Sequence, residues 1–196
     1  MIGARSHHEL VVVFQQEVRR FLLLIGTTGF MNGRRSPFRW FNIGKGMRSK
    51  GSLNISAIVS ACLSMAQTST GAIIVIGREN NLQFYANTGE EIDAAVSAKI
   101  LESIFYKNSP LHDGAVIING NRIEAARCVL PVTDDEEFPA HLGMRHRAAV
   151  GLSESSDAVA IVVSEQTGGI SITHDGELEY DLSPKQLRDL LEKLFN

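Results

Sequence analysis

The sequence predicts an α/β domain built on a mixed central β-sheet flanked by helices. Short apolar runs rich in β-branched residues, such as those at 71–76, 116–118 and 158–163, are bounded by turn residues and are typical of buried strands. Apolar residues at helical spacing occupy several of the segments between these runs. Because strands and helices alternate along the chain, a layered α/β architecture is expected. The 196 residues, 44% of them hydrophobic, suffice for one domain with a core.

We expect the compact domain to begin at Leu53, with Ser52 available to cap the first helix. Helices are expected at 54–66, 92–105, 147–152 and 185–194. Strands are expected at 71–76, 82–85, 116–118, 122–130, 158–163, 170–173 and 178–180. Asp175–Gly176 is typical of a hairpin turn, and Pro184 suits the first turn of the last helix. The acidic segment 131–139 is expected to be a solvated loop.

The N-terminal quarter differs in composition from the rest. Residues 10–25 suit an amphipathic helix with unusually apolar ends. This helix either packs on the domain or is the cytoplasmic end of a longer hydrophobic segment that lies outside this chain. Residues 26–51 contain six basic residues, no acidic residue and many glycines, which favours a solvated linker. A basic aromatic segment beside a membrane could also contact anionic headgroups.

Charge and cysteine content exclude several classes of protein. The net charge of −3 and the pI of about 6.1 argue against bulk binding of nucleic acid, so no nucleic-acid partner is expected. Cys62 and Cys128 lie inside apolar runs and are interpreted as small core residues of a reducing compartment. No secretory signal and no 18-residue apolar stretch is visible in the sequence.

Two stretches carry the residues suited to chemistry. In PLHDGAVII (110–118), a histidine and an aspartate precede a buried strand, next to a glycine that would let a ligand approach the backbone. In GMRHRAAVG (143–151), two arginines and a histidine stand where a helix could begin, and this combination favours anion binding. The first stretch offers metal-type ligands and the second offers phosphate-type ligands.

The motifs LHDGAVII, RHRAAVG and IVVSEQTGG, in this order and spacing, resemble the diadenylate cyclase (DAC) domain family, and within it the membrane-anchored CdaA type. The resemblance covers about 10–196 and is most specific over 108–169. It implies an enzyme, a nucleotidyltransferase that condenses two ATP into cyclic di-AMP and two pyrophosphate. It also implies that 52–196 is the catalytic domain and 1–51 a tail, a juxtamembrane-like amphipathic helix and a basic linker. The expected location is the bacterial cell membrane, anchored by a transmembrane segment outside this chain, with the catalytic domain cytoplasmic.

The resemblance also implies roles for individual residues. Asp113 matches the catalytic aspartate of the family and would hold a metal or help to deprotonate the attacking 3′-hydroxyl. Mn²⁺ or Mg²⁺ is the expected cofactor, held by Asp113, His112 and Glu165. The alternative for His112 is a histidine hydrogen-bonded at a strand end. Catalytic duties extend to the phosphate-binding triplet Arg145, His146 and Arg147. ATP is expected to contact Gly114, Ala115, Leu130, Pro131, Met144, Arg145, His146, Arg147, Ser164, Glu165 and Thr167.

Three positions depart from the family pattern. Gln166 stands where the family commonly has a second acid, Met144 where it often has threonine, and Val129 where it often has an aromatic residue before the leucine. These departures put one metal ligand, one phosphate contact and the stacking of the base in doubt. One site holds one ATP, so turnover is expected only in a homodimer whose two sites face each other. The alternatives are a non-catalytic nucleotide-binding sensor and a metal-dependent nucleotide phosphoesterase.

Overall fold

The computed structural model describes residues 52–80 and 82–195. The expectations for 1–51, namely an amphipathic helix over 10–25 and a basic linker over 26–51, lie outside the described residues. Among the residues that are described, no helix combines the length and apolarity needed to cross a bilayer.

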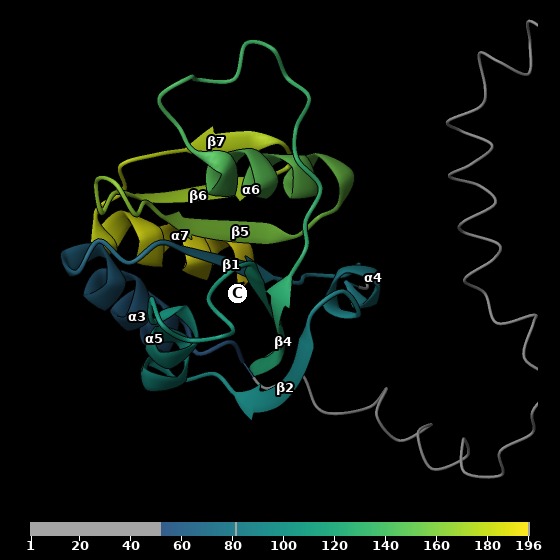
Figure 1. Ribbon diagram of the computed structural model, residues 1–196, viewed down its shortest axis with the longest axis vertical. Coiled ribbons are helices and arrows are strands. Elements are labelled where there is room, and N and C mark those ends of the chain that lie inside the picture. Colours follow the sequence, from purple (N-terminus) through teal and green to yellow (C-terminus); the bar gives the residue numbers. More distant parts are fainter. Residues whose placement is uncertain (1–51, 81, 196) are drawn as a thin grey trace, which may run out of the picture. The chain divides into compact units, whose positions relative to one another are not determined.

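A single seven-stranded sheet forms the centre of the described domain (Figure 1), with strand order β2-β4-β3-β1-β5-β6-β7. The strands are β1 (Ala72–Ile76), β2 (Glu90–Ala95), β3 (Ala115–Asn119), β4 (Arg122–Cys128), β5 (Val159–Val163), β6 (Ile170–His174) and β7 (Glu177–Glu179). Only the β1–β3 pair of this sheet is parallel, and the other pairs are antiparallel. The predicted mixed α/β sheet is therefore confirmed.

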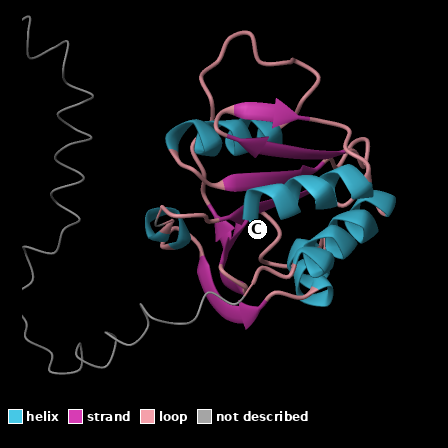
Figure 2. Cartoon of the chain, turned by 180° about the vertical axis from the view of Figure 1, so that it is seen from behind, coloured by secondary structure: helices cyan, strands magenta, loops and turns pink. Residues whose placement is uncertain are grey.

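Helices cover both faces of the sheet. The helices are α3 (Ile55–Gln67), α4 (Gln83–Ala86), α5 (Ala98–Phe105), α6 (Met144–Ser155) and α7 (Pro184–Phe195). The helices α3, α5 and α7 pack on one face, and α6 and α4 pack on the other. Figure 1 shows α6 on the near side of the sheet, and Figure 2, seen from behind, shows the helical layer of the opposite face.

The alternation of side chains along β1 explains how one apolar run serves two cores. Ile74 and Ile76 belong to the cluster under α3 and α7, whereas Ile73 and Val75 belong to the cluster under α6. Every residue of β1 is buried, as is every residue of β5. Continuous apolar runs of this kind are expected where helices cover both faces of a sheet.

Two predicted elements are wrong. The expected strand 82–85 is the short helix α4, because Leu82 and Ala86, four residues apart, both pack under it. The first part of the expected helix 92–105 is the edge strand β2, which pairs with β4. The helix α5 starts only after Ser97, whose hydroxyl accepts a hydrogen bond from the Ile100 backbone N–H.

Helix termini also differ in detail from the predictions. Asn54, rather than Ser52, caps α3, since its side chain accepts a hydrogen bond from the Ala57 backbone N–H. The helix α6 begins at Met144 and not at Arg147. All three members of the arginine–histidine triplet therefore lie in its first turn.

Strand directions bring several distant segments to one end of the sheet. The parallel pairing of β1 and β3 puts the starts of both strands at this end. The strand β5 runs antiparallel to β1, with Val163 opposite Ala72, so β5 finishes where β1 starts. The pairing of Val163 with Ile170 adds the start of β6. Asp113, which precedes β3, and Glu165, which follows β5, therefore share one end of the sheet.

Both cysteines lie in the core, as the sequence predicts. Cys62 and Cys128 are free and buried. Burial raises the pKa of the Cys62 thiol to about 12 and that of the Cys128 thiol to about 11, the latter with a smaller contribution from the charge of Glu124. Neither thiol is therefore a reactive nucleophile near neutral pH.

Candidate active site

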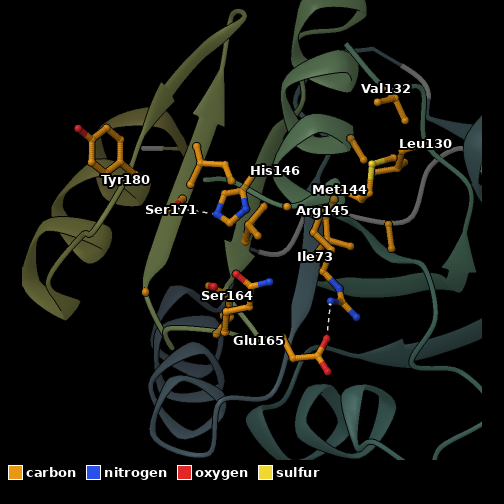
Figure 3. Close-up of a pocket in the computed structure, with 18 of the residues that line it drawn as sticks. Ile73, Leu130, Val132, Met144, Arg145, His146, Ser164, Glu165, Ser171 and Tyr180 are labelled. Atoms are coloured by element: carbon orange, nitrogen blue, oxygen red, sulfur yellow. Dashed lines mark hydrogen bonds and ion pairs between the residues drawn. The ribbon is translucent and has the colours of Figure 1, made fainter. Parts of the chain in front are cut away.

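A cavity of about 1090 Å³ opens at the end of the sheet where β1 and β3 start. Its walls come from the segment before β3, the segment after β4, the first turn of α6, the turn after β5, the start of β6 and the segment after β7 (Figure 3). The predicted site residues among its lining are Asp113, Gly114, Ala115, Leu130, Met144, Arg145, His146, Ser164, Glu165 and Thr167.

Asp113 is presented to this cavity by a backbone that only glycine can follow. Gly114 has φ +139°, and a Cβ atom there would lie 2.7 Å from the carbonyl carbon of Arg127. The pairing of β3 with β4 shifts register at this point, as a β-bulge does. Asp113 is exposed, and within the described residues no hydrogen bond or ion pair engages its carboxylate. The carboxylate is therefore free to act on a ligand.

Arg145 and Glu165 form an ion pair across the cavity (Figure 3). The Arg145 Nη1 atom donates to Glu165 Oε2 at 3.0 Å. The side chain of Glu165 is 58% exposed, so solvent weakens this pair, and exposed pairs of this kind contribute about 0–1 kcal/mol. An anion with more charge and more acceptor oxygens than a carboxylate could displace Glu165 from the guanidinium.

His146 is buried between helix α6 and strand β6. Its Nε2 atom shares a hydrogen bond of 3.2 Å with the hydroxyl of Ser171. Burial lowers the pKa of His146 below its ordinary value of 6.5, and the charge of His141 lowers it further. The imidazole is therefore neutral at physiological pH, so that it holds the first turn of α6 against β6 without adding a positive charge.

Arg147, the third residue of the triplet, is not among the residues that line the cavity. Its guanidinium lies 4.9 Å from the centre of the Phe138 ring and donates to the Thr133 carbonyl at 3.4 Å. Successive helical residues are rotated by about 100°, so residues 145 and 147 point to different sides of α6. Arg147 thus holds the loop between β4 and α6.

His112 and Pro131 are also absent from the cavity lining. The His112 Nδ1–H donates to the Ser109 carbonyl at 2.6 Å, which matches the alternative of a histidine hydrogen-bonded beside a strand end. Pro131 packs instead near Gly151 of α6. The structure therefore brings together ten of the predicted residues and leaves His112, Pro131 and Arg147 outside.

An apolar wall faces these charged groups. Ile73 of β1, Leu130 and Val132 after β4, and Met144 at the start of α6 line this part of the cavity (Figure 3). Met144 is 66% exposed and Val129 67% exposed, so the rim carries unusually accessible apolar side chains. Such a wall suits the flat apolar face of a nucleobase.

Besides Gln166, which the sequence analysis names only as a departure from the family pattern, sequence reasoning missed four polar lining residues. Ser171, His141, Tyr180 and Asp181 all line the cavity, and the rings of His141 and Tyr180 are in edge contact at 6.4 Å. The sequence carries a signal for Ser171, because Ser171 and Thr173 alternate with isoleucines in β6. Both of these polar residues are buried in the structure. The other three lie outside helices and strands, and their positions carry no periodic signal.

Three carboxylates line the cavity, and two of them, Asp113 and Glu165, are the ones that the sequence predicts as ligands of a divalent cation; the third is Asp181. Carboxylate oxygens are hard ligands, which Mg²⁺ and Mn²⁺ prefer. The described part of the chain contains no group of three or more His, Cys, Asp or Glu side chains placed to hold a metal ion. Two carboxylates supply only part of a coordination shell, so a cation at this site would take its remaining ligands from a bound ligand and water, as Mg²⁺ commonly does.

Comparisons with known proteins identify the family of this chain. The family described as "DisA bacterial checkpoint controller nucleotide-binding" (DAC) matches residues 59–178. The chain is 38% identical to the cyclic di-AMP synthase CdaA of Bacillus subtilis over 186 residues, which is 95% of this chain and 65% of that protein. It is 40% identical to a diadenylate cyclase of Listeria monocytogenes over 184 residues, 94% of this chain and 64% of that protein.

Solved structures show the same likeness. A double mutant of DacA from Staphylococcus aureus superposes with a TM-score of 0.71 at 45% identity, covering 72% of this chain and 94% of that one. A hypothetical membrane spanning protein from Bacillus cereus gives a TM-score of 0.65 at 35% identity, covering 88% and 80%. The chain spans just under two thirds of the length of the two curated relatives described above. With a family match over more than half of its residues and a shared fold, this chain belongs to the DAC family.

Proposed function

We propose that this protein is a diadenylate cyclase that condenses two ATP molecules into cyclic di-AMP and two pyrophosphates. The observation that carries the proposal is a cavity lined by both the unengaged carboxylate of Asp113 and the guanidinium of Arg145. That guanidinium forms only a weak, solvent-exposed ion pair with Glu165 among the described residues. Relatives that match over most of this chain are named diadenylate cyclase or cyclic di-AMP synthase, which supports the same reaction.

The reaction consists of two equal substitutions. In each, the 3′-oxygen of one ATP forms a bond to the α-phosphorus of the other, the bond from that phosphorus to the bridging oxygen of the β-phosphate breaks, and pyrophosphate leaves. The hydroxyl proton must be accepted as the new bond forms. Positioning and neutralisation of charge on the phosphoryl oxygens dominate catalysis of such transfers.

Each proposed role follows from a position in the cavity. Asp113 accepts the proton of the 3′-hydroxyl or holds the cation that activates it, since its carboxylate is exposed and unengaged. Arg145 binds the triphosphate after exchanging Glu165 for phosphate oxygens. Ser164 and Thr167, in the turn after β5, donate hydroxyls to the phosphates. Leu130 and the backbone at Gly114–Ala115 face the adenine.

A divalent cation, Mg²⁺ or Mn²⁺, would be held by Asp113 and Glu165 and would neutralise charge on the phosphates. Glu165 would offer the cation the carboxylate oxygen that is not engaged with Arg145, since only its Oε2 atom takes part in the ion pair. Because the cation would also neutralise charge on the phosphates, nucleotide and cation should bind cooperatively. His146, whose pKa burial lowers, is assigned to holding the first turn of α6 through its hydrogen bond with Ser171.

Turnover requires two cavities that face each other, because each nucleotide must present its 3′-hydroxyl to the α-phosphate of the other. A two-fold homodimer satisfies this requirement. The apolar rim residues Val129, Val132 and Met144 favour such a contact, since they are exposed beside the cavity mouth. Specific activity should rise with protein concentration until the dimer saturates; turnover by a size-resolved monomer would contradict the dimer requirement.

We further propose that residues 52–196 form the catalytic domain and that 1–51 link it to a membrane anchor outside this chain, with the domain on the cytoplasmic side. Support comes from the Bacillus cereus protein, which is named as membrane spanning. It also comes from relatives that extend beyond the matched region.

Incubation with ATP and Mn²⁺ or Mg²⁺, followed by separation of the products by mass, tests the function. Cyclic di-AMP and pyrophosphate are the expected products. Formation of ADP or AMP would indicate a phosphoesterase instead, and unchanged ATP that is nevertheless bound would indicate a sensor module. Omission of the cation should abolish synthesis, and a chelator control separates this effect from damage to the protein.

A further inference from the structure

The guanidinium of Arg145 lies directly against Gly71, the residue that precedes β1. A Cβ atom on Gly71 would be 2.6 Å from Arg145 Nη1 and 2.8 Å from Arg145 Cζ. It would also be 3.0 Å from the Cβ of Glu165. No side chain can therefore occupy position 71 while Arg145 and Glu165 stay where they are, because carbon atoms do not approach this closely.

Sheet register explains why Gly71 meets both partners of the ion pair. Ala72 pairs with Val163, so the residue before β1 lies beside the residues that follow β5. Arg145 reaches the same place from the first turn of α6, and its Nη1 donates to Glu165 there. Gly71 is buried beneath this pair.

The requirement for glycine at position 71 comes from space and not from backbone conformation. Gly71 is not among the described residues with positive φ, so alanine could follow its backbone. Its closest neighbours are side-chain atoms, led by the end of the long Arg145 side chain. At Gly89, by contrast, an added Cβ would meet the Ala126 carbonyl oxygen at 2.3 Å, which is backbone that cannot move aside.

We propose that Gly71 is a positioning residue for the reaction, because the absence of a side chain there lets the Arg145 guanidinium reach the place from which it meets the triphosphate. This inference rests on the proposed function of Arg145. Gly71 itself contacts no substrate. An added methyl group would push the guanidinium away from Glu165 and misdirect its donors, and misplacement by about 1 Å can cost about 10²-fold in rate.

The test compares Gly71→Ala with Gly77→Ala, a matched substitution at the other end of β1. At Gly77 an added Cβ would make only ordinary contacts, 3.4 Å to the side chain of Leu82 and 3.7 Å to the Ile118 carbonyl oxygen. We expect Gly71→Ala to weaken ATP binding about ten-fold or more, measured by calorimetry, with a matching rise in KM. Gly77→Ala should change neither quantity by more than about two-fold, and both variants should unfold near the temperature of the parent protein.

A double-mutant cycle separates action through Arg145 from a general structural effect. In an Arg145→Gln background, Gly71→Ala should weaken ATP binding by less than about two-fold, because the group that it displaces has been removed. An equal loss in both backgrounds would overturn the inference, and so would unchanged ATP affinity in the single Gly71→Ala variant.

The nucleotide-free crystal structure of Gly71→Ala gives a readout that does not depend on the reaction. The ion pair between Arg145 and Glu165 should be broken there and kept in Gly77→Ala. If the pair persists in Gly71→Ala, the inference is wrong even when the protein is a cyclase. If the pair is broken but the parent protein makes no cyclic di-AMP from ATP, the proposed function fails while the positioning of Arg145 by Gly71 stands.

Discussion

Each end of the central sheet carries an aspartate, and the two differ in whether the protein supplies hydrogen-bond partners for the carboxylate. At the end where β5 starts, Asp157 accepts hydrogen bonds from the backbone N–H groups of Glu79 and Asn80, at 2.9 Å for the shortest. At the other end, Asp113 is exposed, and the described residues offer its carboxylate no such partner. The first aspartate completes a turn, whereas the second is available for a ligand.

The same contrast extends to the arginines of α6. Among the described residues, the guanidinium of Arg145 at the cavity pairs only with the exposed carboxylate of Glu165. Arg147, two residues later, is engaged by an aromatic ring and a backbone carbonyl. The groups assigned to the fold are engaged by partners in the protein, whereas those assigned to a substrate are either unengaged, as Asp113 is, or held by an exposed partner, as Arg145 is. The comparison therefore predicts which substitutions affect activity and which affect stability.

The largest expected effect is on catalysis by Asp113. Asp113→Asn should lower the rate of cyclic di-AMP synthesis by about 10²–10⁴-fold, the range for loss of a general base. The melting temperature should not fall, because no interaction within the described domain depends on this carboxylate. Product formation measured by mass and thermal unfolding checks both parts; retained turnover would remove Asp113 from its role.

The next largest effect is on ATP binding, and we expect it from substitution of Arg145 but not of Arg147. Arg145→Gln should weaken ATP binding by about ten- to a hundred-fold, since charged hydrogen bonds to the triphosphate are lost. Arg147→Gln should mainly lower the melting temperature, because it releases the loop that carries Thr133 and Phe138. Calorimetric titration with ATP beside thermal unfolding measures the two quantities. An equal loss of affinity in both variants would show that the rotation around α6 does not decide their roles.

Asp157 provides the converse experiment. Asp157→Ala should reduce the free energy of unfolding by about 0.5–2 kcal/mol, the range for loss of a capping side chain. The folded fraction should keep its turnover, because Asp157 lies at the end of the sheet away from the cavity. Denaturant unfolding and activity per folded molecule are the measurements. Lost activity without lost stability would break the contrast between the two ends.

A smaller effect, on the pH dependence of the free energy of unfolding, is expected from His146. Its folded pKa lies below 6.5, so on acidification the unfolded chain takes up this proton before the folded protein does. The contribution to stability is therefore complete above pH 6.5 and is lost as the pH falls through 6.5 toward the folded pKa. His146→Gln, which can still bond Ser171, should flatten this part of the pH profile of unfolding. Titration of His146 by NMR with a midpoint above 6.5 would contradict the assignment.

The smallest effect is expected from chemical modification of the two cysteines. Neither Cys62 nor Cys128 should react with an alkylating reagent at pH 8 while the protein is folded, because burial raises both pKa values to about 11 or above. Mass spectrometry before and after denaturation measures the modification. Alkylation of Cys128 in the folded state would mean that the cavity it lines opens further than the structure shows.

Local pattern sufficed for the parts of the fold that depend on local burial. The runs that form β1 and β5 are apolar throughout, because each strand is covered on both faces. Such an uninterrupted apolar run is enough to predict a buried strand from the sequence. The helix α7 is expected from Pro184, which suits a first helical turn. The strand β2 could not be found in this way, because an edge strand takes its stability from pairing with β4, thirty or so residues later.

The sequence by itself determined the mixed α/β class and the motif residues Asp113, Arg145 and Glu165, because residue types and their order carry that information. Only the tertiary structure decided which of them share a cavity. The antiparallel placement of β5 beside β1 brought Glu165 to the end of the sheet that bears Asp113, and the rotation of α6 turned Arg147 away. Neither fact has a local signal, since both follow from how strands far apart in the chain pair and how a helix packs across them.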